Sequence, residues 1–136
     1  MKYSRTQIKE LEFAIIGAAI EVHRQLGPGL LESVYHKCME QELTLRGLDF
    51  VSESNVPLIY KERELNTNLR CDLVVEGMIA LELKSVECFI PIFDAQLLTY
   101  MKLLQCPKGL LINFNCINIV KEGRRSLVNE IYASLQ

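Results

Sequence analysis

The sequence has no long apolar run and no closely spaced pair of cysteines. No stretch approaches the roughly 20 apolar residues of a transmembrane helix, and the opening Met-Lys-Tyr-Ser-Arg lacks a secretory pattern. We therefore expect a cytoplasmic location and no membrane partner. The five cysteines include no C-x-x-C pair, which argues against a zinc or iron–sulfur site and favours reduced, largely buried thiols.

The sequence also lacks an excess of either charge. Lys and Arg number 15 and Asp and Glu 17, for a net charge of −2, so any contact with nucleic acid must come from a local patch. There is no internal repeat, low-complexity segment or linker-like stretch. A chain of 136 residues that is 49% hydrophobic predicts one globular domain spanning residues 1–136.

The first third of the sequence has helical periodicity. Ser4 and Gln7 are spaced as a capping box, Gly27-Pro28-Gly29 ends the first helix, and a second helix is predicted over 31–46. The residues expected on the buried faces are Ile8, Leu11, Ile15, Ala18, Ala19, Val22 and Leu26, then Leu31, Val34, Tyr35, Cys38, Met39 and Leu43. Apolar residues surround the first helix, so it packs within one chain or against a second, as in a homodimer or with a partner chain.

From residue 56 the pattern becomes that of strands and shorter helices. We predict strands at 56–60, 69–75, 78–86 and 110–114, a further strand at 117–120, and turns at 61–64 and 107–109. Helices are predicted at 94–104, with Asp94 as N-cap, and at 126–135. The order α-α-β-β-β-α-β-(β)-α predicts an α/β fold with a central mixed β-sheet flanked by helices.

Three charged residues lie inside the apolar strands of the central hairpin: Asp72, Glu82 and Lys84. Alternation places Glu82 and Lys84 on the same face of one strand. Two converging carboxylates hold a hard divalent cation such as Mg²⁺, and a nearby lysine orients water or stabilises charge on phosphorus. The same residues also suit a cross-strand ion pair on a solvated face, and both interpretations stay open at this point.

The length of the turn distinguishes these interpretations. If Glu76-Gly77 is a two-residue loop, Asp72 opposes Leu81 and points to the face opposite Glu82. The two carboxylates converge only if the connection has an odd count, as in a loop at 76–78, or if a bulge intervenes. A metal site therefore predicts an irregular hairpin.

The residues around this hairpin carry a family resemblance. Asp72 and Glu82-Leu83-Lys84 resemble the D…(D/E)-x-K core of the PD-(D/E)XK nuclease superfamily, although Cys71 stands before Asp72 where proline is expected. Gly29-Leu-Leu-Glu32-Ser-Val-Tyr35 resembles the motif of the GxxExxY family, a branch of that superfamily. Two later blocks are similar to the same family: Gln96-Leu-Leu-Thr-Tyr100 and Gly109-Leu-Leu-Ile-Asn113-Phe114. The resemblance covers roughly residues 10–125.

The resemblance implies a restriction-endonuclease-like core and a Mg²⁺- or Mn²⁺-dependent nuclease acting on DNA or RNA. It implies Asp72, Glu82 and Glu32 as metal ligands and Lys84 as the catalytic lysine. It also implies that Gln96 and Tyr100, on one helix face, contact the substrate. Alternation adds Arg70 as a phosphate-binding candidate on the Asp72 face.

Several of these residues also have simpler interpretations. Glu32 suits the first turn of a helix, Tyr35 suits packing, Gly29 suits a flexible backbone position, and His36 suits a helix contact with Glu32. Many relatives carry a histidine shortly before the glutamine, whereas this sequence reads Pro91-Ile-Phe-Asp-Ala-Gln96. The alternatives to a nuclease are an inactive nuclease-fold module that binds a partner, and a component active only with a partner chain.

Overall fold

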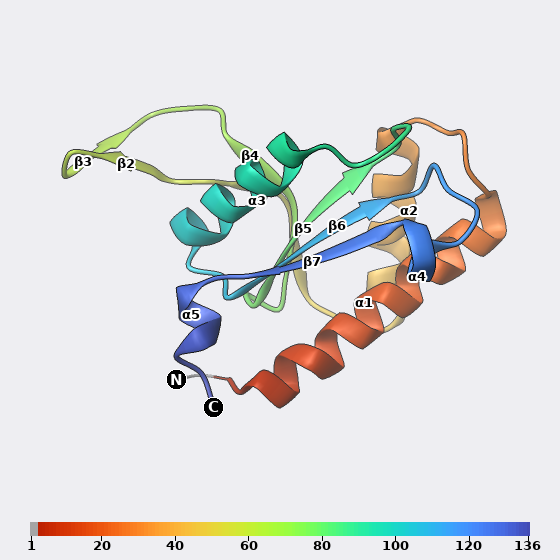
Figure 1. Cartoon of the computed structure of the whole chain (residues 1–136), viewed down its shortest axis with the longest axis horizontal. Helices are drawn as coiled ribbons and strands as arrows, with labels where there is room; N and C mark the ends of the chain where they lie inside the picture. Colours follow the sequence, from red (N-terminus) through yellow and green to blue (C-terminus); the bar gives the residue numbers. More distant parts are fainter. Residues whose placement is uncertain (1–2) are drawn as a thin grey trace.

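The computed structural model describes residues 3–136 and contains a five-stranded sheet with helices on both faces (Figure 1). The strand order is β1-β4-β5-β6-β7, in which only β5 and β6 pair in parallel. The strands are β1 (Phe50–Asn55), β4 (Arg70–Val75), β5 (Ile79–Lys84), β6 (Lys108–Asn113) and β7 (Arg124–Val128). The predicted fold class, a mixed sheet flanked by helices, is confirmed.

Two hydrophobic clusters cover the two faces of the sheet. One joins it to α1 (Arg5–Leu26) and α2 (Glu32–Leu45) through strand residues such as Leu73, Leu81 and Ile112. The other joins it to α3 (Pro91–Leu104) through Val74 and Ala80. Because β4 and β5 contribute to both clusters, charged residues in them must be accommodated between two apolar layers. In the described part of the chain, no helix is both long and apolar enough to cross a membrane.

Helix α1 begins at the predicted capping box, in which Ser4 and Gln7 bond each other's backbone N–H. The expected buried stripe is confirmed except at four positions: Leu26, Leu31 and Val34 are 39%, 74% and 38% exposed, and Cys38 is partly buried. Leu26 is the last residue of α1 and Leu31 is the N-cap of α2, so both lie at helix ends. Ile15, Ile16 and Val22 are buried within this one chain, whereas Ile20 is 41% exposed.

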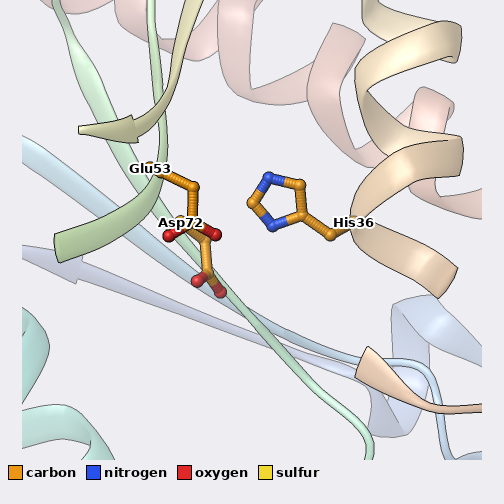
Figure 2. A group of neighbouring side chains, drawn as sticks. All are labelled: His36, Glu53 and Asp72. Carbon is orange, nitrogen blue, oxygen red and sulfur yellow. The ribbon is translucent and has the colours of Figure 1, made fainter. Parts of the chain in front are cut away.

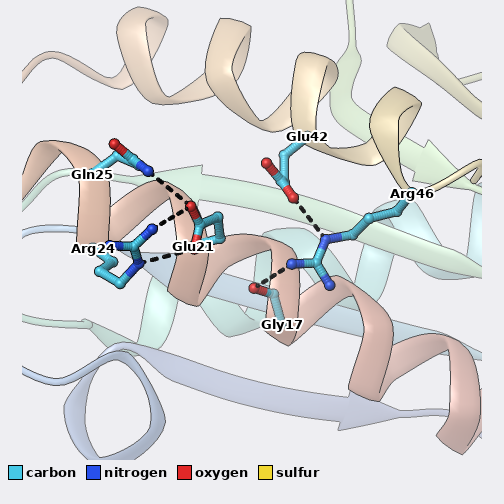
Figure 3. Close-up of polar contacts among 6 residues, drawn as sticks. All are labelled: Gly17, Glu21, Arg24, Gln25, Glu42 and Arg46. Carbon is cyan, nitrogen blue, oxygen red and sulfur yellow. Dashed lines mark hydrogen bonds and ion pairs between the residues drawn. The ribbon is translucent and has the colours of Figure 1, made fainter.

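A polar contact joins the end of α2 to α1 (Figure 3). Arg46, just after α2, donates from Nε to Glu42 at 2.9 Å and from Nη2 to the Gly17 carbonyl of α1 at 3.3 Å. On α1, Arg24 pairs with Glu21 at 2.8 Å. The bond to Gly17 joins the two helices, so it contributes to the position of α2 beside the sheet.

Strand β1 was not predicted, and it forms an edge of the sheet. Its burial alternates, as expected for a strand with one covered face. The predicted strand at 56–60 starts only at residue 58, and the predicted turn at 61–64 is shorter, because β2 (Leu58–Tyr60) and β3 (Arg63–Leu65) pair as a separate hairpin. Figure 1 shows this hairpin as an arm projecting from the sheet.

Four predictions for the second half of the chain are wrong. The turn expected at 107–109 overlaps β6, which already begins at Lys108. The expected strand at 117–120 is replaced by the short helix α4 (Ile119–Glu122), which Asn118 caps. The expected helix at 126–135 is replaced by β7 and the short helix α5 (Glu130–Ala133), because residues 124–128 pair with the edge of β6. Asp94 is not an N-cap: Pro91 starts α3, and the Asp94 carboxylate instead pairs with Arg125 at 2.6 Å.

The β4–β5 connection has three residues, as a shared carboxylate site requires. Val75 pairs with Ile79, which leaves residues 76–78 as the loop. Glu76 and Gly77 have φ angles of 53° and 69°, and the Met78 N–H donates to the Val75 carbonyl at 3.0 Å. The odd count turns Asp72 and Glu82 toward the same region, so the geometric condition set by the sequence is met.

Candidate active site

Asp72 and Glu82 meet where the regular β4–β5 ladder ends. The last paired residues are Leu73 and Leu81. Beyond them, the Asp72 N–H donates to Glu82 Oε2 at 2.8 Å, and the Leu83 N–H donates to Asp72 Oδ2 at 2.8 Å. Each carboxylate thus binds the backbone of the opposite strand, where a carbonyl would normally accept. These reciprocal bonds hold the two acidic groups together.

Glu82 is buried beside a like charge. Glu82 is only 7% exposed. Its pKa is raised to about 7, first by burial and then by the negative charge of Asp72. The positive charge of Lys84 lowers this pKa, but with a smaller effect. Among residues 3–136, no ion pair joins Lys84 to either carboxylate. The geometry does not contain the cross-strand ion pair that the sequence also allowed.

Lys84 lies two residues beyond Glu82 at the end of β5 and is half-buried. Its Nζ lies 4.3 Å from the centroid of the Phe93 ring in α3. A cation over an aromatic face is attracted to the ring and still has N–H groups available to other partners. The ammonium therefore stands near the acidic pair without being neutralised by it.

A cleft of about 440 Å³ opens between α2 and the β1–β4 edge of the sheet. Its lining residues are Glu32, Ser33, His36, Lys37, Glu40, Ser52, Glu53 and Asp72. Glu32 stands in the first turn of α2, so the structure brings this predicted ligand to the same cleft as Asp72. The cleft gives solvent-borne ions and ligands access to one member of the acidic pair.

His36, Glu53 and Asp72 converge in this cleft from α2, β1 and β4 (Figure 2). One ligand atom from each lies within 4.8 Å of the others. Sequence reasoning missed Glu53 because it missed β1, and for His36 it favoured a helix contact with Glu32 over a ligand pair with that residue. The pairing of β1 with β4 is regular on both sides of Glu53, whose φ is 52°. The sequence pattern around residue 53 contains no signal for this local distortion.

The three predicted substrate contacts occupy different places. Tyr100 is buried, and its pKa is raised by burial and then by the negative charge of Glu82, so it lies near the acidic pair. Gln96 is exposed on the same helix. Arg70 is exposed and donates to Asn55 Oδ1 at 2.7 Å. Of the described residues that line the cleft, none is Gln96, Tyr100 or Arg70.

Comparison with known proteins places this arrangement in a family. Residues 9–126 match the model of the PD-(D/E)XK nuclease superfamily. The chain belongs to this superfamily. The search of curated proteins found no match, and neither did the search of solved structures. Membership in the PD-(D/E)XK superfamily indicates a nuclease-type domain and metal binding in general, and assignment to the GxxExxY branch stays a prediction.

The G-x-x-E-x-x-Y segment has a structural role in this PD-(D/E)XK domain. Tyr35 Oη donates to the Gly27 carbonyl at 2.6 Å and accepts from the Leu30 N–H at 3.2 Å. Its ring stacks on Phe114 with centroids 4.4 Å apart. Gly29 has a φ of 99°, which glycine adopts most easily. Tyr35 and Gly29 therefore shape the loop before α2, as the packing interpretation expected, and so position Glu32 at the cleft.

The metal-ligand set expected from the resemblance fits these residues in chemical type. Glu82, Asp72 and Glu32 are all oxygen donors, which hard divalent cations prefer. In the described part of the chain, Asp72 and Glu82 already meet with neither in an ion pair, and Glu32 lines the same cleft as Asp72. A divalent cation would relieve the repulsion that raises the pKa of Glu82.

Proposed function

We propose that this protein is a divalent-metal-dependent nuclease of the GxxExxY branch that hydrolyses phosphodiester bonds in DNA, with RNA as the alternative substrate. The observation that carries the proposal is the convergence of Asp72 and Glu82 through reciprocal bonds, with no ion pair to either carboxylate among residues 3–136. Two neighbouring carboxylates that are partly or fully buried lower the stability of the folded state. Their convergence is favourable when a divalent cation binds, and membership in the nuclease superfamily supports that interpretation.

Each residue has a separate task in the proposal. Asp72 and Glu82, with Glu32 from α2, hold Mg²⁺ or Mn²⁺, which supplies Lewis-acid polarisation of the phosphate and acidifies bound water. Lys84 positions the attacking water and stabilises negative charge that develops on the phosphate oxygens. The Phe93 ring, 4.3 Å from Lys84 Nζ, restricts the positions of the ammonium. This restriction favours a role in orienting the attacking water over general screening of negative charge.

Nucleic acid is the proposed partner, and its contacts are local because the net charge is −2. Tyr100 and Gln96 contact the substrate on the α3 side, and Arg70 binds phosphate at the start of β4. Tyr100 is close enough to the acidic pair for their charges to raise its pKa, which makes it the best supported of the three. The absence of the histidine found before the glutamine in many relatives favours reduced or altered activity relative to them.

A nuclease assay with matched variants tests the proposal. The purified protein is incubated with single- and double-stranded DNA and with RNA, in Mg²⁺, in Mn²⁺ and in chelator. Cleavage is expected only with metal, and Lys84→Ala should lower its rate by about 10²-fold or more, as loss of a positioned charge-stabilising group does. Lys61→Ala, on the projecting arm, is the matched control and should cleave like wild type.

Folding of each variant is checked by circular dichroism, so that a loss of rate reports chemistry. If wild type and Lys84→Ala are equally inert on every substrate with both metals, the enzyme proposal is wrong. The domain would then be a nuclease-fold binding module, and retained binding of labelled nucleic acid or of a partner chain would identify it.

A further inference from the structure

A chain of hydrogen bonds fixes the orientation of His36. Its Nε2 lies 2.7 Å from Ser52 Oγ, and Ser52 Oγ also contacts Glu40 Oε2. The serine hydroxyl has one proton, and an ionised carboxylate only accepts, so the hydroxyl donates to Glu40. Ser52 Oγ must then accept from His36, which places the proton of a neutral imidazole on Nε2.

This direction of bonding leaves Nδ1 of His36 as the nitrogen with a free lone pair. A histidine held through one ring nitrogen by a polar chain, with the other nitrogen free, is the usual arrangement of a metal-binding histidine. The side chain of His36 is only 13% exposed, so it has few alternative positions. A ring nitrogen and carboxylate oxygens of Glu53 and Asp72 lie within 4.8 Å of one another.

We propose that His36, Glu53 and Asp72 bind a first-row transition-metal ion, and that His36 makes this cleft prefer such an ion to Mg²⁺. Magnesium takes oxygen ligands and retains much of its water, whereas transition-metal ions accept an imidazole nitrogen together with carboxylates. Glu53 and His36 stand outside the Asp72, Glu82 and Glu32 set. The inference deepens the proposed function, on which it rests, by naming the residues that select the ion.

Binding of Mn²⁺, a paramagnetic probe, tests the inference without any nuclease assay. Titration calorimetry should give a lower dissociation constant for Mn²⁺ than for Mg²⁺ in the wild type. His36→Gln should weaken Mn²⁺ binding about tenfold or more, as loss of a metal-binding histidine or its support does, while Mg²⁺ binding changes little. Pulsed electron paramagnetic resonance of bound Mn²⁺ should show coupling to an imidazole nitrogen that is lost in His36→Gln.

Two control variants match the chemistry of the substitutions. His23→Gln removes the other histidine, whose Nε2 contacts the Cys116 carbonyl at 2.8 Å, and it should keep the nitrogen coupling. Glu53→Gln changes an exposed residue, so it should keep the fold and still weaken Mn²⁺ binding. Glu64→Gln, on the projecting arm, should bind Mn²⁺ like wild type.

The inference is overturned if His36→Gln and Glu53→Gln, both folded, bind Mn²⁺ as wild type does, or if bound Mn²⁺ shows no nitrogen coupling. These outcomes are independent of cleavage. Mn²⁺ binding that depends on His36 in a protein that cuts no nucleic acid would support the metal site and overturn only the nuclease proposal. Cleavage with Mn²⁺ binding insensitive to His36 would do the reverse.

Discussion

Replacement of Glu82 by glutamine should make the metal-free protein more stable. Glu82 is buried, and its ionisation is opposed by burial and by the charge of Asp72. Glutamine is nearly isosteric, and its carbonyl oxygen can accept the Asp72 N–H bond that Glu82 Oε2 now accepts. The amide also adds N–H groups that can donate to the Asp72 carboxylate. The substitution removes the buried charge and keeps the hydrogen bond.

The size of the effect follows from the pKa of Glu82. That pKa is about 7 in the folded protein, against an ordinary value of 4.5. Because a tenfold change in a protonation equilibrium corresponds to about 1.4 kcal/mol, ionised Glu82 destabilises the folded state by about 3 kcal/mol. This is a large part of the roughly 5–15 kcal/mol by which domains are stable.

The direction of the pH dependence also follows. Below pH 4.5 the carboxyl is protonated in both states, so it affects stability little. Between 4.5 and 7 the folded state retains a proton that the unfolded state has lost, so stability falls as pH rises. Above pH 7 both states are ionised, and the folded state carries the whole destabilisation. The advantage of Glu82→Gln should therefore grow from near zero to about 3 kcal/mol across this range.

Urea unfolding in chelator, at one pH below 4.5 and another above 7, measures this difference for Glu82→Gln and wild type. Glu64→Gln, an exposed glutamate on the projecting arm, is the control and should show no comparable gain. The reasoning is refuted if Glu82→Gln is no more stable than wild type above pH 7. A gain of the same size at both pH values would also refute it, because the cause would not be ionisation.

Other substitutions and one labelling experiment test the packing around the site. Tyr35→Phe removes a hydroxyl that bonds two backbone groups and should lower the free energy of unfolding by about 1–3 kcal/mol, whereas Tyr60→Phe, 61% exposed, should change it little in the same urea titration. Gly109→Ala would place a methyl 2.5 Å from an α3 methionine sulfur and should lower the thermal midpoint, at a cost of about 1–3 kcal/mol. A thiol reagent should label exposed Cys88 quickly and buried Cys71 only on unfolding, because burial raises the pKa of the Cys71 thiol.

Local chemistry allowed much of the fold to be predicted from the sequence. A capping box and a Gly-Pro-Gly stop depend on residues close in the chain, so the bounds of α1 followed directly. Parity made the turn a test: a metal site required an odd loop or a bulge, and the pairing of Val75 with Ile79 shows the three-residue loop. The sequence therefore stated the condition for Asp72 and Glu82 to converge, and the structure shows that it is met.

Long-range pairing decided the rest. Residues 124–128 form a strand because they pair with the edge of β6. The local pattern at 126–135 carries no information about that distant partner. Likewise β1 pairs with β4 across the chain, and only that pairing brings Glu53 beside Asp72. His36 meets both because helix packing sets the position of α2. The sequence alone singled out Asp72 and Glu82, whereas only the tertiary contacts bring His36 and Glu53 beside Asp72.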